Sequence, residues 1–397
     1  IHRVMSSPVI TVGRSTQVYE ALLLMQERKI EHLPVTDEDG KIIGMVCNRD
    51  ILQRHSYGAI VLTREIEQAA TPEDVTQWCR RTPMLVKALL DCGAHPRSAT
   101  RMIADICDAA TERLLALAIA QAGPPPVDFA FVALGSQARQ EQTLLTDQDN
   151  AILYDGPESE AAIRYFGELG RCVCEGLDRS GYAFCHGKVM AMNPMWCCSL
   201  ETWKNHFTTW IARAEPQELL DFAIFFDLRT VGSDDRLRKE LRGQINAALS
   251  GNPAFFPHFA RSALQFKPPT RWFGFTLQRT PQPRLDLKAA LMPLVCFARL
   301  YALKHELEET HTLDRIDALA RCGVLSTGSR TEIVAAYEFL MRLRLRQQAE
   351  ALSAGLPLDN HINPARLGRL EQTQLHQAFT QINVVQKRIS YDFLGGT

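Results

Sequence analysis

The residues best suited to chemistry lie between positions 129 and 154. An apolar run from Phe129 to Leu134 stops at Gly135 and Ser136 and gives way to a polar, helix-compatible segment that ends near Leu145. This order predicts a strand, a tight turn and a short helix. Gly135 would let the backbone approach a ligand closely, and Ser136 would cap the helix. Because a helix N-terminus presents unpaired N–H groups and a partial positive charge, a phosphate would fit at this turn.

Two carboxylates follow the turn. Asp147 and Asp149 open a segment rich in strand-forming residues that runs to Tyr154. Because side chains alternate along a strand, both carboxylates are expected to point to one face. Carboxylates held this close repel each other unless a divalent cation lies between them. Mg²⁺ bound by carboxylates and substrate phosphates is the usual arrangement in nucleotidyl-transfer sites. The alternative is a capped helix followed by a solvated acidic turn.

The same segment resembles the signature of the DNA polymerase β-like nucleotidyltransferase superfamily. It is similar to the bacterial enzymes that uridylylate the PII signalling protein or adenylylate glutamine synthetase. It is more similar still to nucleotidyltransferase signalling proteins with CBS domains, whose pattern G-S-x-A-R-x-E-Q-x-x-x-T-D-Q-D-N it matches almost letter for letter. The resemblance implies a nucleoside triphosphate substrate and Mg²⁺ or Mn²⁺. It implies catalysis and metal binding by Asp147 and Asp149, and nucleotide binding by Gly135, Ser136, Arg139 and Glu141.

A third carboxylate is expected from a later strand, because the superfamily normally uses three. The segment from Tyr182 to Asn193 is the expected strand, but it contains no Asp or Glu. Asp227, which follows an apolar run, is the best substitute as a catalytic residue. Since burial of an ionised Asp requires a partner, the competing interpretation is a structural ion pair with Arg229. Without a third carboxylate, the site would bind nucleotide and metal but turn over slowly.

Composition narrows the class of protein. With 397 residues, 46% of them hydrophobic, the chain is long enough for two or three domains with substantial cores. A formal net charge of −1 gives no general attraction for nucleic acid or anionic membranes, so a nucleic-acid partner is not expected. The apolar stretches are too short to cross a bilayer. Eleven scattered cysteines without paired C-x₂-C spacings are typical of reduced thiols in a core, and we expect a cytoplasmic protein.

Residues 1–58 predict the order β-α-β-β-α and resemble a CBS module. Such modules work in pairs and often bind adenine nucleotides between them. In the ligand motif of that family, Gly44 and Asp50 match, whereas Cys47 stands in place of a hydroxyl residue. The resemblance therefore implies Asp50 as a ligand residue, and the alternative is a purely structural module. Because one module is visible, its partner is expected either upstream of Ile1 or from a second copy of the chain.

The first predicted helix of this module carries apolar residues that a lone module would leave in water. They are Leu22, Leu23 and Met25, with Ile30 just beyond the helix. Exposure of such a patch predicts a two-fold homodimer through residues 1–58. The competing arrangement is that the helices after Tyr57 cover this face within one chain.

The rest of the chain is dominated by helical periodicity. The fold class is α+β, with a CBS module, a helical linker over 59–122, a polymerase β-like domain over 123–235 and a helical bundle over 236–397. Within that bundle, apolar spacing predicts helices over 287–309, 330–353 and 370–391. Arg342, Arg344 and Arg346 are candidates for binding an acidic partner or a triphosphate, but residues two apart on a helix face different sides, so the alternative is a solvated or ion-paired surface.

These observations predict a metal-dependent nucleotidyltransferase. It would transfer a nucleoside monophosphate from a nucleoside triphosphate to a hydroxyl, by resemblance on a protein acceptor, in a regulatory role. One alternative is a nucleotide-sensing regulator that has the fold but little catalysis, which a missing third carboxylate would favour. A nucleic-acid polymerase is disfavoured by the near-neutral charge.

Overall fold

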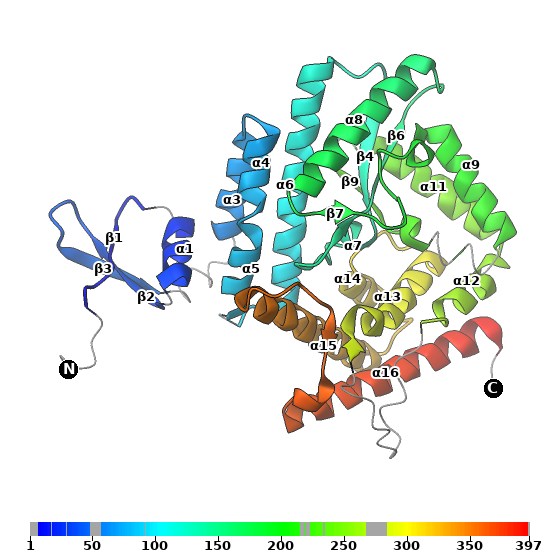
Figure 1. The fold of residues 1–397 in the computed structure, drawn as a ribbon. Coiled ribbons are helices and arrows are strands. Elements are labelled where there is room, and N and C mark those ends of the chain that lie inside the picture. The colour runs from blue at the N-terminus through cyan, green and yellow to red at the C-terminus, as the bar shows by residue number, and fades with distance from the viewer. Residues whose placement is uncertain are drawn as a thin grey trace.

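The computed structural model describes residues 7–16, 18–28, 30–47, 57–91, 93–214, 219, 223–232, 235–266 and 284–395. It confirms the α+β class, with a small N-terminal sheet, a central mixed-sheet domain and a helical C-terminal region (Figure 1). No helix in the described part of the chain is both long and apolar enough to cross a bilayer.

The N-terminal sheet has the order β1-β2-β3. β1 pairs in parallel with β2, as the intervening helix requires, and β2 pairs antiparallel with β3. The predicted β-α-β-β order is therefore confirmed, whereas the helix predicted from Asp50 begins outside the described residues. The elements are β1 (Val12–Gly13), α1 (Val18–Arg28), β2 (His32–Thr36) and β3 (Ile42–Cys47).

Helix α1 packs against the helices that follow the N-terminal sheet. It contacts α3 and α5 and lies between the sheet and these helices (Figure 1), and Met25 is only 1% exposed. Met25 is therefore buried within one chain, as expected from the competing arrangement in which later helices cover α1. The side chains of Leu22 and Leu23 lie outside the described residues. The linker helices are α3 (Tyr57–Gln68), α4 (Pro72–Cys79), α5 (Thr82–Asp91) and α6 (Pro96–Ala122).

The central sheet has the order β8-β6-β4-β9. β4 pairs antiparallel with β6 and β9, and β6 pairs in parallel with β8. Every residue of β6 and all but the first of β4 are buried, because α6 and α8 cover one face and α9 and α11 the other (Figure 1). The strands are β4 (Phe129–Leu134), β6 (Asn150–Tyr154), β8 (Cys197–Ser199) and β9 (Leu228–Val231), and the helices are α8 (Glu160–Arg179), α9 (Leu200–Arg213) and α11 (Arg236–Gly251).

Two shorter elements complete the central domain. Helix α7 (Gly135–Ala138) follows β4 directly, and β5 (Asp147–Gln148) pairs in parallel with β7 (Ala183–Phe184). The strand expected from Tyr182 to Asn193 is therefore only two residues long. The 3-10 helices here are η1 (Pro194–Trp196) and η2 (Ala223–Phe226).

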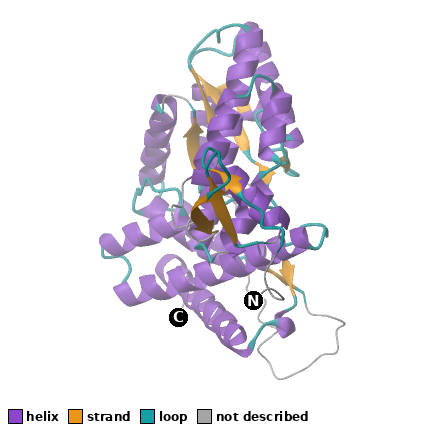
Figure 2. Cartoon of the chain, turned by 90° about the vertical axis from the view of Figure 1, so that its left-hand side faces the viewer, coloured by secondary structure: helices purple, strands orange, loops and turns teal. Residues whose placement is uncertain are grey.

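The C-terminal region is a helical layer beneath the central sheet, as Figure 2 shows from the side. Its three predicted long helices are confirmed, although α13 ends earlier, at Lys304. Almost all of α13 is buried, since α12, α14, α15 and α16 surround it. The elements are α12 (Phe255–Ala263), β10 (Leu285–Asp286), α13 (Leu287–Lys304), α14 (Thr312–Arg321), α15 (Thr327–Ser353), β11 (His361–Ile362), η4 (Pro364–Arg366) and α16 (Arg369–Leu394).

Candidate active site

Strand β4 leads into the site through Gly135. This residue has φ 54, in the left-handed region that favours glycine, and its N–H donates to the backbone oxygen of Asp227 at 3.2 Å. A Cβ atom here would lie 2.9 Å from the side chain of Ile224 and 3.1 Å from Oδ2 of Asp149. The position therefore requires glycine, and the backbone passes directly beside one of the two predicted metal ligands.

The helix after this turn is much shorter than expected. α7 is a single turn, its N-cap is Leu134, and Ser136 lies inside it. The prediction that Ser136 caps a helix running to Leu145 is therefore wrong. The physical reason is that Gln140 adopts φ 55, which ends the helical conformation. Ser136 still lines the pocket described below.

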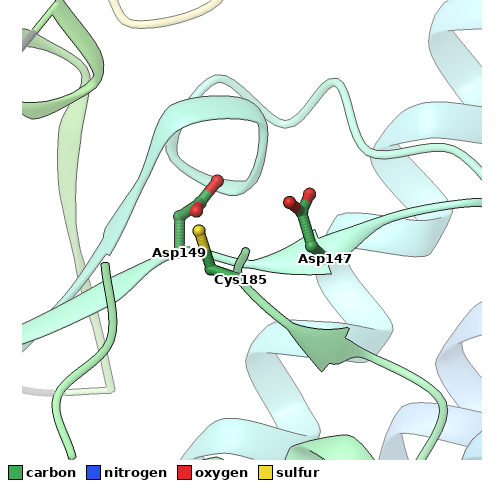
Figure 3. Close-up of side chains that lie close together, drawn as sticks. All are labelled: Asp147, Asp149 and Cys185. Carbon is green, nitrogen blue, oxygen red and sulfur yellow. The ribbon is translucent and has the colours of Figure 1, made fainter. Parts of the chain in front are cut away.

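The predicted acidic pair comes together with a thiol. Asp147 begins β5, Asp149 lies between β5 and β6, and Cys185 follows β7 (Figure 3). Each of the three offers a ligand atom, and these atoms all lie within 4.8 Å of one another. The expectation that the two carboxylates face the same region is confirmed, and the structure adds sulfur as a third donor.

Asp149 is buried without full hydrogen-bond satisfaction. Asp149 is 7% exposed. Within the described part of the chain, its Oδ1 has no hydrogen-bond partner. Burial and then the charge of Asp147 raise the pKa of Asp149 to about 6. A buried, partnerless carboxylate oxygen next to a second carboxylate is an environment that a divalent cation would relieve. The residues present therefore fit a divalent cation.

Cys185 is not among the predicted site residues, because the cysteines are expected in the core. The core assignment does hold for Cys174, Cys197 and Cys198, which are buried. Cys185 is only half-buried, and burial followed by the charge of Asp149 raises its pKa to about 11. Its position depends on β7, the two-residue strand just before it. A strand this short leaves no periodic pattern in the sequence, so the sequence carries no signal for Cys185.

A pocket lies between the central domain and the C-terminal helices. Lys288 at the start of α13 and Arg344 of α15 supply basic groups opposite Asp147 and Ser136. Burial lowers the pKa of Arg344 to about 10, so it remains a cation at neutral pH. The lining residues are Ser136, Arg139, Glu141, Gln142, Thr143, Leu145, Thr146, Asp147, Lys288, Leu291, Met292, Val295, Tyr337, Met341 and Arg344.

The three alternating arginines of α15 separate as helical geometry requires. Arg344 is buried and lines the pocket, whereas Arg342 and Arg346 are exposed and line a different groove beside Lys87 and His95. Of the three, only Arg344 therefore lines the pocket that contains Asp147, and helical spacing alone does not distinguish among them.

Arg139 and Glu141 line the pocket but also bind each other. Arg139 Nε donates to Glu141 Oε2 at 2.7 Å, and Arg139 Nη1 donates to Asp227 Oδ2 at 2.6 Å. The other oxygen of Glu141 accepts from the backbone N–H of Thr312 at 2.7 Å. Both predicted nucleotide-binding side chains are thus part of a buried ionic network that reaches the C-terminal helices.

Asp227 is the centre of this network. It is 0% exposed; Arg299 Nη2 donates to its Oδ2 at 2.6 Å, and Arg315 Nη1 lies 2.6 Å from its Oδ1. Burial opposes ionisation of Asp227, but these guanidinium groups and Arg139 hold its pKa well below the usual range. Because both oxygens are held by arginines, this position does not support the expectation that Asp227 is the third catalytic carboxylate.

The predicted ion pair between Asp227 and Arg229 is wrong. Arg229 instead pairs with Asp108 of α6, with Arg229 Nη2 lying 2.8 Å from Asp108 Oδ2. Asp227 lies just before β9 and Arg229 lies within it, so strand alternation does not bring their two side chains to one face. The last predicted site residue, Asp50, lies outside the described residues.

Comparison with known families divides the chain into three matched regions. Residues 1–57 match the model described as "CBS domain", and residues 80–217 match "Putative nucleotidyltransferase DUF294". Residues 253–393 match "Putative nucleotidyltransferase substrate binding domain". The pocket lies where the last two matched regions meet, because Ser136 and Asp147 come from the first of them and Lys288 and Arg344 from the second.

The curated proteins that are similar to this chain include two that match it over a short segment. An uncharacterised protein of Methanopyrus kandleri is 42% identical over 65 residues, which are 16% of this chain and 33% of that protein. An inosine-5'-monophosphate dehydrogenase of Methanocaldococcus jannaschii is 37% identical over 54 residues, or 14% of this chain and 11% of that enzyme. The chain thus spans a third or less of these relatives. The matched regions together make the chain similar to a CBS domain followed by the two domains described as "Putative nucleotidyltransferase DUF294" and "Putative nucleotidyltransferase substrate binding domain".

Proposed function

We propose that the protein transfers a nucleoside monophosphate from a nucleoside triphosphate to an acceptor hydroxyl, with Mg²⁺ or Mn²⁺ bound at Asp147 and Asp149. The observation that carries this proposal is that Asp147, one of the acidic pair, lines the same pocket as the basic side chains of Lys288 and Arg344. Lys288 and Arg344 lie where the phosphates of a bound triphosphate would need neutralisation, and Ser136 supplies a hydroxyl at the same wall.

Different residues at the site would bind the cation, bind the phosphates and exclude water. Asp147 and Asp149 position the cation, which when bound supplies stabilisation of the charge that develops on the reacting phosphate. Ser136, Lys288 and Arg344 bind and orient the phosphates. The apolar wall from α13 and α15, including Leu291 and Met341, keeps water from the opposite side of the pocket.

We further propose a protein as the acceptor and a regulatory role for the N-terminal module. The near-neutral net charge supports a protein over a nucleic acid. The CBS match supports binding of an adenine nucleotide, for which Asp50 is the candidate ligand residue. A homodimer through the N-terminal module belongs to the same proposal and is tested below.

The test is transfer of label. Purified protein with a cell lysate, each α-labelled nucleoside triphosphate and Mg²⁺ is expected to yield a labelled macromolecule. The double variant Asp147→Asn/Asp149→Asn should give none, and with a chelator present it should melt no lower than the wild type. Asp155→Asn, an exposed carboxylate beyond the end of β6, is the matched control and should label normally. Full labelling by the double variant would reject the proposal.

A non-catalytic nucleotide sensor is the second candidate function. It is favoured by Asp227, whose two oxygens are occupied by arginines and which therefore offers no third carboxylate at the cation. Tight, cation-dependent binding of a nucleoside triphosphate without label transfer to any acceptor would identify this function.

A further inference from the structure

The strand pairing beside the acidic pair places Cys185 at the candidate cation site. β5 and β7 run in parallel, with Asp147 opposite Ala183 and Gln148 opposite Phe184. One residue beyond the end of each strand, the same register sets Asp149 opposite Cys185. The juxtaposition therefore follows from the backbone pairing, and Figure 3 shows the thiol beside Asp149 on the side of the acidic pair.

The arrangement leaves one buried oxygen without a partner. Asp149 Oδ1 has no hydrogen-bond partner in the described part of the chain, and Asp149 is 7% exposed. An unpaired carboxylate oxygen in this environment costs free energy unless a cation or a proton occupies the site. The carboxylate that might have completed the site, Asp227, is held by arginines on both oxygens. Among the described residues, the third ligand atom grouped with the pair is sulfur.

We propose that Cys185 is the third protein ligand at this site, so that two carboxylates and one thiolate bind a thiophilic divalent cation such as Zn²⁺ or Co²⁺. Binding forms a metal–sulfur bond and releases the thiol proton to solvent, with no change of oxidation state. The proposal rests on the assignment of Asp147 and Asp149 as cation ligands in the proposed function, and it deepens that assignment.

The mixed donor set has a consequence for ion choice. Mg²⁺ binds oxygen ligands and leaves a thiol protonated, whereas Zn²⁺ and Co²⁺ accept carboxylate and thiolate together. In this site Cys185 therefore does not coordinate Mg²⁺, but it does coordinate Zn²⁺. Zn²⁺ should displace Mg²⁺ from the acidic pair, and this displacement should depend on the thiol.

Titration of the full chain with Co²⁺, under a reductant that does not bind metals, tests the proposal. A thiolate-to-Co²⁺ charge-transfer absorption is expected in the near ultraviolet. Cys185→Ser should abolish this absorption and weaken Zn²⁺ binding at least tenfold in competition with a chromophoric chelator. Asp149→Asn should also abolish it. The matched control is Cys322→Ser, which removes an exposed thiol and should leave the absorption intact.

The outcomes separate this inference from the proposed function. If Mn²⁺ binds through Asp149 but Co²⁺ gives no thiolate absorption, the role of Cys185 is overturned and the acidic pair stands. An absorption that survives Cys185→Ser overturns it as well. If no divalent cation binds, both the inference and the cation site of the proposed function fail. Circular dichroism of each variant shows whether a loss comes from unfolding.

Discussion

Two buried aspartates of this protein have opposite environments. Asp149 is next to another carboxylate and lacks a partner for Oδ1 among the described residues, whereas Asp227 is surrounded by Arg139, Arg299 and Arg315. Desolvation raises the pKa of both carboxyl groups; at Asp149 the charge of Asp147 adds to this effect, whereas at Asp227 the arginines reverse it. Asp149 therefore fits a cation site, whereas Asp227 forms ion pairs that connect the central domain to the C-terminal helices.

For Asp149 we expect stability that falls with rising pH in the metal-free protein. Its pKa is raised from 3.8 to about 6, so the protonated form is favoured in the folded state. The associated stability is fully present below pH 3.8 and is lost as the pH rises through about 6. Asp149→Asn mimics the neutral acid. With a chelator present, it should exceed the wild type in stability by roughly 3 kcal/mol above pH 6 and match it in acid.

Chemical denaturation at several pH values measures this difference. Asp155→Asn serves as the control, since Asp155 is an exposed carboxylate whose removal should change stability little at any pH. An Asp149→Asn variant that is never more stable than the wild type would contradict an unfavourable burial of the charged Asp149 carboxylate, whose Oδ1 lacks a hydrogen-bond partner among the described residues.

For Asp227 we expect a large loss of stability on substitution. Asp227→Asn leaves three buried guanidinium groups without their shared anion, which costs on the order of 3–5 kcal/mol. Because its pKa is depressed, the stability that Asp227 contributes is present above its ordinary pKa and lost only as the pH falls through the acid range. Calorimetric unfolding measures the loss. The surface pair of Asp317 and Arg330 provides the control, because Asp317→Asn should cost less than about 1 kcal/mol.

At the scale of elements, the turn from β4 into α7 leaves no room for a side chain at Gly135. Gly135→Ala would place an L side chain at φ 54, which costs about 1–2 kcal/mol, and would also press Cβ against Ile224. The variant should therefore lose both stability and nucleotide binding. Gly167→Ala in α8 is the matched control, because it has open space around Cβ and should be neutral or stabilising by up to about 1 kcal/mol. Equal melting temperatures for the two variants would contradict the strained geometry.

Helix α15 presents its two faces to different sites. Arg344 lines the pocket and donates Nε–H to Asn360 at 2.8 Å, whereas Arg342 lies on the exposed face. Arg344→Met should lower nucleoside triphosphate affinity at least tenfold, because a phosphate loses a buried cationic partner. Arg342→Met should leave affinity unchanged, and Arg344→Lys should recover part of it. Calorimetric titration with a nucleoside triphosphate and Mg²⁺ provides the comparison, and equal losses in the two Met variants would contradict the placement.

At the scale of the whole molecule, the sheet of the N-terminal module carries exposed apolar side chains among the described residues. α1 packs within the chain against α3 and α5, while Ile42, Ile43 and Met45 of β3 are 60%, 51% and 64% exposed. Such a cluster favours a second copy of the module as its cover. The chain should therefore sediment as a dimer at micromolar concentration, and Ile43→Glu/Met45→Glu should shift it to a monomer. Leu370→Glu, at an exposed position of α16, is the control and should have no effect. A wild-type chain that keeps the mass of one copy at every concentration would exclude this assembly.

The sequence by itself determined what depends on neighbours along the chain. A glycine at the end of an apolar run indicated the turn at Gly135, and alternation brought Asp147 and Asp149 together, because both patterns operate within a few residues. Tertiary structure decided the rest. Cys185 reaches the pair through a two-residue strand, Lys288 and Arg344 arrive from helices more than a hundred residues away, and Asp227 takes distant arginines in place of nearby Arg229. Side chains so far apart in sequence meet only when whole helices and sheets pack, since packing rather than local spacing sets which faces come into contact.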